Sequence, residues 1–215
     1  MTVPRIVGVC NHLSYMVDEK SFLVIRHGLT WDEVTPENLL LVDEKGKVLK
    51  GEGKCEATAF WIHRAIHMGR PVDARCVLHT HMPWSTTLCN LAGGKLEMIH
   101  QNCLRFWNRI AYDPAYNGLV LDTSEGDRMC AAMGNASVLM HANHGVVVVG
   151  KSVADAFDDI YYLERAAEVV VKAMSTGRPL RAIPKEVCES YADDDPLCFA
   201  DVHFESCKRK VRLLN

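Results

Sequence analysis

The chain has 215 residues, of which 48% are hydrophobic and 24% are charged, and its formal net charge is −3. This composition supports one sizeable core. Acidic and basic residues are interspersed, which argues against a nucleic-acid groove with its basic stripe. No apolar run is long enough to span a bilayer, and the N-terminus lacks the apolar stretch of a signal peptide. We therefore expect a cytoplasmic protein that binds neither nucleic acid nor membrane.

The nine cysteines are scattered along the chain, and none forms a Cys-X-X-Cys pair. Several lie inside apolar runs, where cysteine packs as a small hydrophobic residue. An odd number without close spacing is typical of reduced thiols and not of a disulfide framework.

The first third of the chain is rich in strand signals, and a helix follows it. Thr35-Pro36 marks the start of a short helix or turn, with Thr35 as the N-cap. The remaining elements are read from apolar spacing and from turn residues. We expect strands at 21–26, 39–43 and 48–50, a turn at 44–47, and a helix over 58–68 that stops at Gly69-Arg70-Pro71.

The rest of the chain alternates between strands and helices. A strand is expected from the apolar run at 76–78 through His79 and His81, helices at 85–91 and at 124–133 (capped by Ser124), strands at 110–112, 119–121, 137–141 and 146–149, and a long helix from the cap Ser152 to about 174. This order predicts an α/β fold with a mainly antiparallel or mixed sheet. We expect a single domain over 1–215, with its core at about 8–174 and a C-terminal helical tail at 175–215.

Two histidines, His79 and His81, stand one residue apart at the end of the apolar run that begins at Cys76. Side chains at positions i and i+2 of a strand point to the same face. A third imidazole is available at His144, directly before another apolar run. Three neutral imidazoles with an open fourth position are typical of a catalytic zinc or manganese centre. The alternative is that the His79/His81 pair is an ordinary, partly buried pair bonded to the backbone.

Other histidines have simpler explanations. His63 and His67 lie one helical turn apart and could form a metal pair, but we favour structural roles because His79 and His81 already supply a site. His141, three residues before His144, is expected either to support a metal ligand or to pack within its strand.

The segments around these histidines together resemble the class II aldolase/adducin family. The similar segments are residues 76–81, Asn143-His144-Gly145 before the valine-rich strand, the helix from Ser152 to Ala166, and residues 60–71. The resemblance implies a central, mainly antiparallel sheet sandwiched between helices, and a homotetramer with active sites at subunit interfaces around a divalent metal. It also implies that His79, His81 and His144 are the metal ligands. The metal of such aldolases polarises a carbonyl so that an enolate can form; zinc is expected, with manganese as the alternative.

The chain departs from the sugar-phosphate aldolases of this family at positions that matter for chemistry. The Ser-Ser-Glu step that supplies an acid/base carboxylate falls on Ala57-Thr58-Ala59, and Glu56 is the nearby replacement candidate. The phosphate-binding Gly-Asn becomes Asn11-His12, and the Thr-Gly turn becomes His27-Gly28, so a phosphorylated substrate is not expected. His100 and Arg105 lie where family members contact substrate, and Arg105 offers a fork for a carboxylate. A polar loop or subunit contact is the other explanation for both residues.

The sequence leaves three functions open. The first is a metal-dependent carbon–carbon lyase that cleaves an unphosphorylated hydroxy-oxo acid as an aldolase does. The second is a decarboxylase of a hydroxy or aromatic carboxylic acid, because loss of carbon dioxide needs no base on the leaving group. The third is a non-catalytic assembly module like the adducin head domains.

Overall fold

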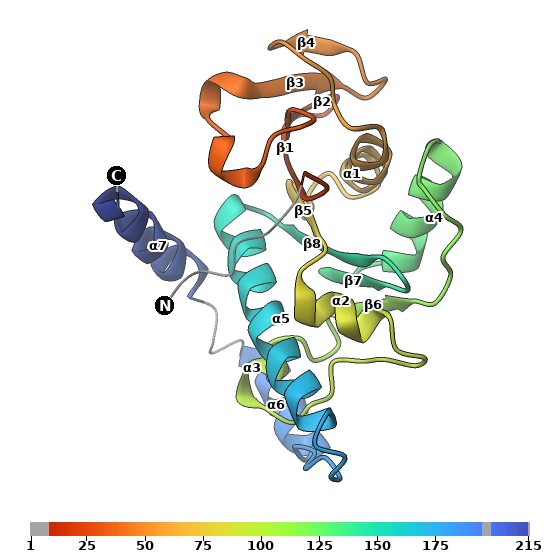
Figure 1. The fold of residues 1–215 in the computed structure, drawn as a ribbon, viewed down its shortest axis with the longest axis vertical. Helices are drawn as coiled ribbons and strands as arrows, with labels where there is room; N and C mark the ends of the chain where they lie inside the picture. The colour runs from red at the N-terminus through yellow and green to blue at the C-terminus, as the bar shows by residue number, and fades with distance from the viewer. Residues whose placement is uncertain (1–8, 195–198, 215) are drawn as a thin grey trace.

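The computed structural model describes residues 9–194 and 199–214, which fold around one eight-stranded sheet (Figure 1). Its strands are β1 (His12–Asp18), β2 (Ser21–Ile25), β3 (Leu39–Asp43), β4 (Val48–Lys50), β5 (Cys76–Thr80), β6 (Ile110–Asp113), β7 (Val138–His141) and β8 (Gly145–Gly150). The helices are α1 (Ala57–Gly69), α2 (Pro83–Cys89), α3 (Gln101–Leu104), α4 (Thr123–Met133), α5 (Val153–Met174), α6 (Lys185–Asp194) and α7 (Ala200–Leu214), with short 3-10 turns η1 (Trp31–Glu33) and η2 (Pro36–Asn38).

The strands are ordered β4-β3-β2-β1-β5-β8-β7-β6 across the sheet. Every neighbouring pair is antiparallel except β6 and β7, which run parallel because α4 crosses between them. The expected α/β fold with a mainly antiparallel sheet between helices is confirmed. Within the described ranges, no helix is both long enough and apolar enough to cross a membrane.

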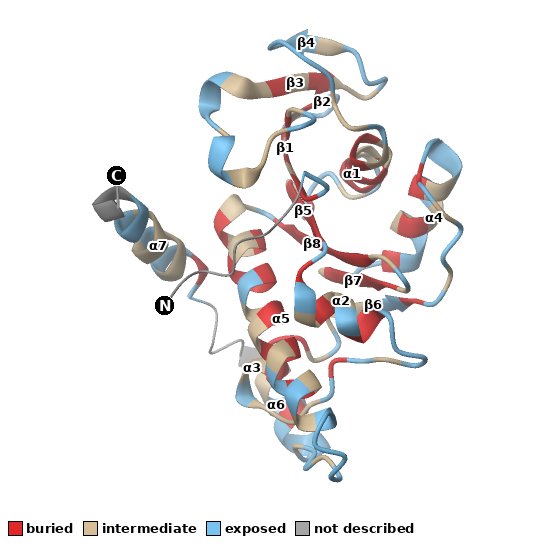
Figure 2. Cartoon of the chain, viewed as in Figure 1, coloured by how far each residue is buried: buried red, intermediate tan, exposed pale blue. Residues whose placement is uncertain are grey.

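Alternating residues of the central strands divide the core into two layers. Val77 of β5 and Val147 of β8 pack with α1 and α4 on one face of the sheet. Leu78 and Val148 point the other way, into a cluster with α2 and α5. Figure 2 shows β5, β7 and β8 as almost continuously buried strands between these helices. This period-2 alternation fixes which face each histidine of β5 occupies.

The long helix α5 begins as its sequence predicts. The Ser152 hydroxyl accepts a hydrogen bond from the Asp155 backbone N–H at 3.1 Å, and the Asp155 carboxylate accepts one from the Ser152 N–H at 3.0 Å. This reciprocal capping box satisfies backbone donors that would otherwise lack partners at the helix start. Because this capping box lies directly after β8, α5 turns back along the sheet.

The structure differs from the sequence-based expectation at several points, three of which concern the strands and the cap of α4. The segment 119–121 is a loop, not a strand: only Val120 is buried, while Leu119 and Leu121 are exposed. The cap of α4 is Asp122, whose carboxylate accepts from the Ser124 N–H at 2.9 Å, so Ser124 lies inside the helix. Strand β1 is present although no strand was expected at its position.

Strand β1 carries polar groups into the core, where they meet histidines of α1. The Ser14 hydroxyl lies 2.6 Å from His63 Nδ1 and 2.6 Å from His67 Nε2. His67 Nδ1 donates to the Ala74 carbonyl at 2.8 Å, because a carbonyl can only accept. His67 Nε2 then accepts from the Ser14 hydroxyl, and the Ser14 oxygen accepts from His63. Both histidines are therefore held in a buried structural network.

Burial makes this network sensitive to acid. Burial lowers the pKa of His67 from 6.5 to about 4, against the opposing effect of its bond to the Ala74 carbonyl, and it lowers the pKa of His63 well below 6.5. Between pH 6.5 and about 4 the unfolded chain binds more protons than the folded chain. The stabilisation is therefore complete above pH 6.5 and is lost as the pH falls.

We predict that the free energy of unfolding of the metal-free protein falls as the pH is lowered from 7.5 to 5. Each buried histidine contributes at most about 1.4 kcal/mol per pH unit to this slope. His67→Gln removes one such group and should flatten the slope, whereas His27→Gln changes an exposed histidine and should leave it unaltered. Urea denaturation at several pH values measures the slopes, and an unchanged slope in His67→Gln would contradict the prediction.

Candidate metal centre

His79 is positioned by the pleat of β5. It lies two residues after Val77, so its ring occupies the sheet face that α1 covers. Its Nδ1 lies 3.0 Å from the Val146 carbonyl of the paired strand β8. The carbonyl fixes the proton on Nδ1 and leaves Nε2 as the lone-pair nitrogen. A second bond of this kind is what orients histidine ligands in metal sites.

His81 follows the last residue of β5 and is held through its backbone. Its N–H donates to the Asn11 side-chain oxygen at 3.0 Å. The chain then enters α2, and the first N–H groups of this helix, from Trp84 and Ser85, donate to the Glu164 carboxylate of α5 at 2.9 and 3.0 Å. The backbone is therefore held by hydrogen bonds at His81 itself and just after it, at the start of α2.

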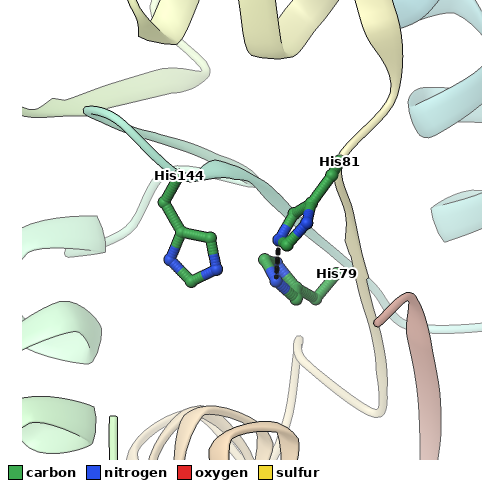
Figure 3. A group of neighbouring side chains, drawn as sticks. All are labelled: His79, His81 and His144. Atoms are coloured by element: carbon green, nitrogen blue, oxygen red, sulfur yellow. Dashed lines mark hydrogen bonds between the residues drawn. The ribbon is translucent and has the colours of Figure 1, made fainter. Parts of the chain in front are cut away.

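His144 comes from the connection between β7 and β8. Asn143 adopts a left-handed conformation with φ of 55°, which turns the chain sharply before β8 begins. Figure 3 shows the ring of His144 with one nitrogen turned toward His79 and His81. The end of strand β5 and one tight turn thus bring three imidazoles together.

The three rings lie close enough for small side-chain adjustments to bring them onto one tetrahedral metal. Their ligand nitrogens all lie within 4.8 Å of one another, and the Nε2 atoms of His79 and His81 are 3.0 Å apart. A zinc–nitrogen bond of about 2.0–2.1 Å places two tetrahedral ligands roughly 3.3 Å apart. In the part of the chain that the structure describes, this is the one group of three or more His, Cys, Asp or Glu side chains so arranged.

Gly145 is required at its position because the chain passes so close to β5. A Cβ atom on Gly145 would lie 2.6 Å from His81 Cδ2 and 2.6 Å from the Thr80 carbonyl oxygen. Both distances are shorter than real Cβ contacts allow, so any other residue would push His81 away. The Asn-His-Gly sequence therefore brings a ligand in and leaves room for the neighbouring ligand.

The electrostatic setting keeps the three histidines neutral. Burial lowers the pKa of His144 to about 4 and the pKa of His79 well below 6.5, and the neighbouring imidazoles lower both further. Burial also lowers the pKa of His81. Neutral imidazole is the form that binds metal, so the donor set fits a divalent ion at neutral pH.

His12 lies beside the three ligands, which the sequence analysis did not anticipate. It is the cross-strand partner of His79, and the two rings stack with centroids 6.3 Å apart. It is only 5% exposed, and neither ring nitrogen has a hydrogen-bond partner among the described residues. Burial lowers the pKa of His12 to about 4, while the nearby Glu56 carboxylate opposes that shift. Predicting β1 would have placed His12 here.

Glu56 is the N-cap of α1, and its Oε2 accepts from the Ala59 N–H at 2.7 Å. Its carboxylate is near enough to His12 to influence the charge of that ring. It does not belong to the group of ligand atoms formed by the three histidines. The structure therefore brings Glu56 to the side of the site, next to His12.

On the other side of the site lie Tyr116 and His141. The Tyr116 ring is 6.2 Å from the His144 ring and 5.9 Å from His141, and the residue is about half exposed at 47%. His141 lies 5.2 Å from His144 and bonds to Asp113. Neither Tyr116 nor Asp113 was singled out from the sequence, because the contact of Tyr116 with His144 and that of Asp113 with His141 depend on the pairing of β6 with β7.

His100 and Arg105 are not brought to the three histidines. His100 is the N-cap of α3, where its Nδ1 accepts from the Asn102 N–H at 3.2 Å. Arg105 is buried, paired with Asp158 of α5, and stacked over the Tyr162 ring at 4.3 Å. It lines a cavity of about 270 Å³ together with Gly150, at the end of β8 opposite His144.

Comparison with known proteins agrees with this architecture. The family described as Class II Aldolase and Adducin N-terminal domain matches residues 6–171. A Pseudomonas aeruginosa protein, whose name places it with class 2 aldolases and states no substrate, is 33% identical over 187 residues, which is 86% of this chain and 71% of that protein. Human beta-adducin is 31% identical over 163 residues, 74% of this chain but only 22% of beta-adducin.

Two solved structures have a similar fold. An aldolase II superfamily protein from Pseudomonas syringae superposes with a TM-score of 0.89 at 30% identity, covering 98% of this chain and 86% of that one. L-fuculose 1-phosphate aldolase from Glaciozyma antarctica gives a TM-score of 0.75 at 23% identity, over 86% of this chain and 72% of that one, and shares the fold. The chain belongs to the class II aldolase/adducin family.

Proposed function

We propose that the protein is a divalent-metal-dependent carbon–carbon lyase, in which His79, His81 and His144 hold the ion. The observation that carries this proposal is the convergence of three neutral imidazoles, one buried, one half-buried and one exposed, whose nitrogens lie within 4.8 Å of one another. Zinc suits the ligand set best, with manganese as the alternative. When bound, such an ion would supply Lewis-acid polarisation of a substrate oxygen.

The substrate we propose is a small unphosphorylated hydroxy-oxo acid, cleaved as an aldolase cleaves it. At the position where sugar-phosphate aldolases bind phosphate, Asn11 is engaged with the His81 backbone and His12 is buried against His79. A neutral His12 has one nitrogen that accepts and one that donates, so it can hold a substrate hydroxyl. The Glu56 carboxylate is near enough to raise the pKa of that ring, against the effect of burial.

His100 and Arg105 would contact substrate only from a neighbouring subunit, because within one chain they lie away from the three histidines, and Arg105 would first have to leave its buried pairing with Asp158. This agrees with the proposed homotetramer, in which active sites form between subunits. On that arrangement, the partner's face around α3 would close over the site of the first subunit. We also propose a cytoplasmic location for the protein.

Decarboxylation of a hydroxy or aromatic acid is the second candidate. The Glu56 carboxylate already accepts the Ala59 N–H, which leaves less freedom for proton transfer. Loss of carbon dioxide needs no base to deprotonate a hydroxyl. An assembly role like that of the adducins is favoured by the 31% identity to human beta-adducin, and it requires no bound metal.

Metal analysis together with product analysis separates these candidates. We predict that the purified protein holds about one divalent ion per chain, and that His79→Ala and His144→Ala lose most of it because each removes a ligand. The zinc- or manganese-loaded protein is then tested on a panel of hydroxy-oxo and hydroxy-aromatic acids, and carbonyl products and carbon dioxide are measured. A protein that binds metal but cleaves no panel member would contradict the lyase, and one that binds no metal would favour the assembly role.

Gly145→Ala provides a sharper test of the site geometry. We predict at least a tenfold loss of zinc affinity, since the new Cβ would overlap His81 Cδ2 and displace that ring. Gly134→Ala is the matched control, because Gly134 has a positive φ of 54° and open space around it, so that substitution strains the backbone without touching a ligand. Competition with a chromophoric chelator measures both affinities, and equal losses in the two variants would argue against the predicted geometry.

A further inference from the structure

His141 is a buried histidine that the proposed reaction does not use. It ends β7, is 1% exposed, and stands opposite Asp113 in the parallel pairing of β7 with β6. Its Nδ1 lies 2.9 Å from Asp113 Oδ2. An ionised carboxylate can only accept, so Nδ1 carries the proton and Nε2 of the neutral ring is an acceptor.

The Asp113 carboxylate is itself held firmly in place. Arg128 of α4 donates to both of its oxygens, at 3.0 Å from Nη1 to Oδ1 and 2.8 Å from Nη2 to Oδ2. Burial tends to raise the pKa of Asp113, but the bonds from Arg128 and from the Ala115 N–H outweigh it and lower that pKa. The carboxylate is therefore ionised, and the acceptor nitrogen of His141 has a fixed direction.

Two buried nitrogens beside this network have no partner. Among the described residues, neither His141 Nε2 nor His144 Nδ1 has a hydrogen-bond partner. Their rings are neighbours, with centroids 5.2 Å apart. A linear bond of about 2.9 Å between nitrogens of two imidazoles places the ring centroids roughly 5 Å apart, so a small ring rotation would join them. Buried polar atoms rarely stay unpaired without a functional reason.

We propose that His141 is a positioning residue for the metal ligand His144. His141 Nε2 accepts the Nδ1–H of His144 and so directs the other nitrogen of that ring toward His79 and His81. A histidine ligand ordinarily donates its second N–H to such an acceptor. His79 already does so to the Val146 carbonyl. The inference rests on the proposed metal site and extends it through Asp113 to Arg128.

The test compares two substitutions of the same side chain. His141→Leu fills a similar volume but removes the acceptor, whereas His141→Gln keeps an oxygen that can accept from His144. We expect His141→Leu to bind zinc about 10- to 100-fold more weakly than the unmodified protein. We expect His141→Gln to recover most of that affinity. Both are measured in the full chain by competition with a chromophoric chelator.

His67→Leu is the control for a merely structural loss, because it also removes a buried and bonded imidazole. It should lower the unfolding temperature of the metal-free protein without weakening zinc binding. The visible spectrum of the cobalt-loaded protein gives a second readout: it should change in His141→Leu and be retained in His141→Gln. Unchanged zinc affinity in His141→Leu, or equal losses in the Leu and Gln variants, would overturn the positioning role. Failure of the unmodified protein to bind zinc would instead overturn the metal site itself.

Discussion

The antiparallel pairing of β5 with β8 is the constraint on which the site depends. It places the Val146 carbonyl against the ring of His79 and brings residue 144 back to the end of β5. The approach is so close that only glycine fits at residue 145. The strands β1 and β7 flank this central pair, and they supply His12 on one side and His141 on the other. Register, more than loop shape, therefore sets the positions of the histidines.

The histidines of this fold differ in what they contact and in how far they are buried. His63 and His67 are fully buried and bond to Ser14, and His67 also bonds to a backbone carbonyl. The three histidines of the metal site range from buried to exposed, and they turn ring nitrogens toward one another, with the Nε2 atoms of His79 and His81 in hydrogen-bond contact at 3.0 Å. The ligand histidines thus differ from the structural pair in that their ring nitrogens gather at one point.

Much of the site could be predicted from the sequence, because each ligand histidine lies in a short segment with a recognisable pattern. The i, i+2 spacing places His79 and His81 together, and the turn before a valine-rich strand marks His144. His12 could not be found in this way, since β1 buries its polar residues, His12 and Ser14, and leaves Leu13 and Tyr15 half-buried. The contact of Asp113 with His141 depends on a parallel pairing of distant segments, which no local pattern specifies.

Gly145 limits how this site can change. No side chain fits at residue 145, because the Thr80 backbone and the His81 ring lie against it. This side of the site, where β5 pairs with β8, therefore cannot change by substitution. Variation in the chemistry around the three ligands must therefore come from the α1 side, through His12 and Glu56, or from the loop that carries Tyr116. Within this fold, a change of substrate preference would leave the ligand turn intact and appear at those two edges.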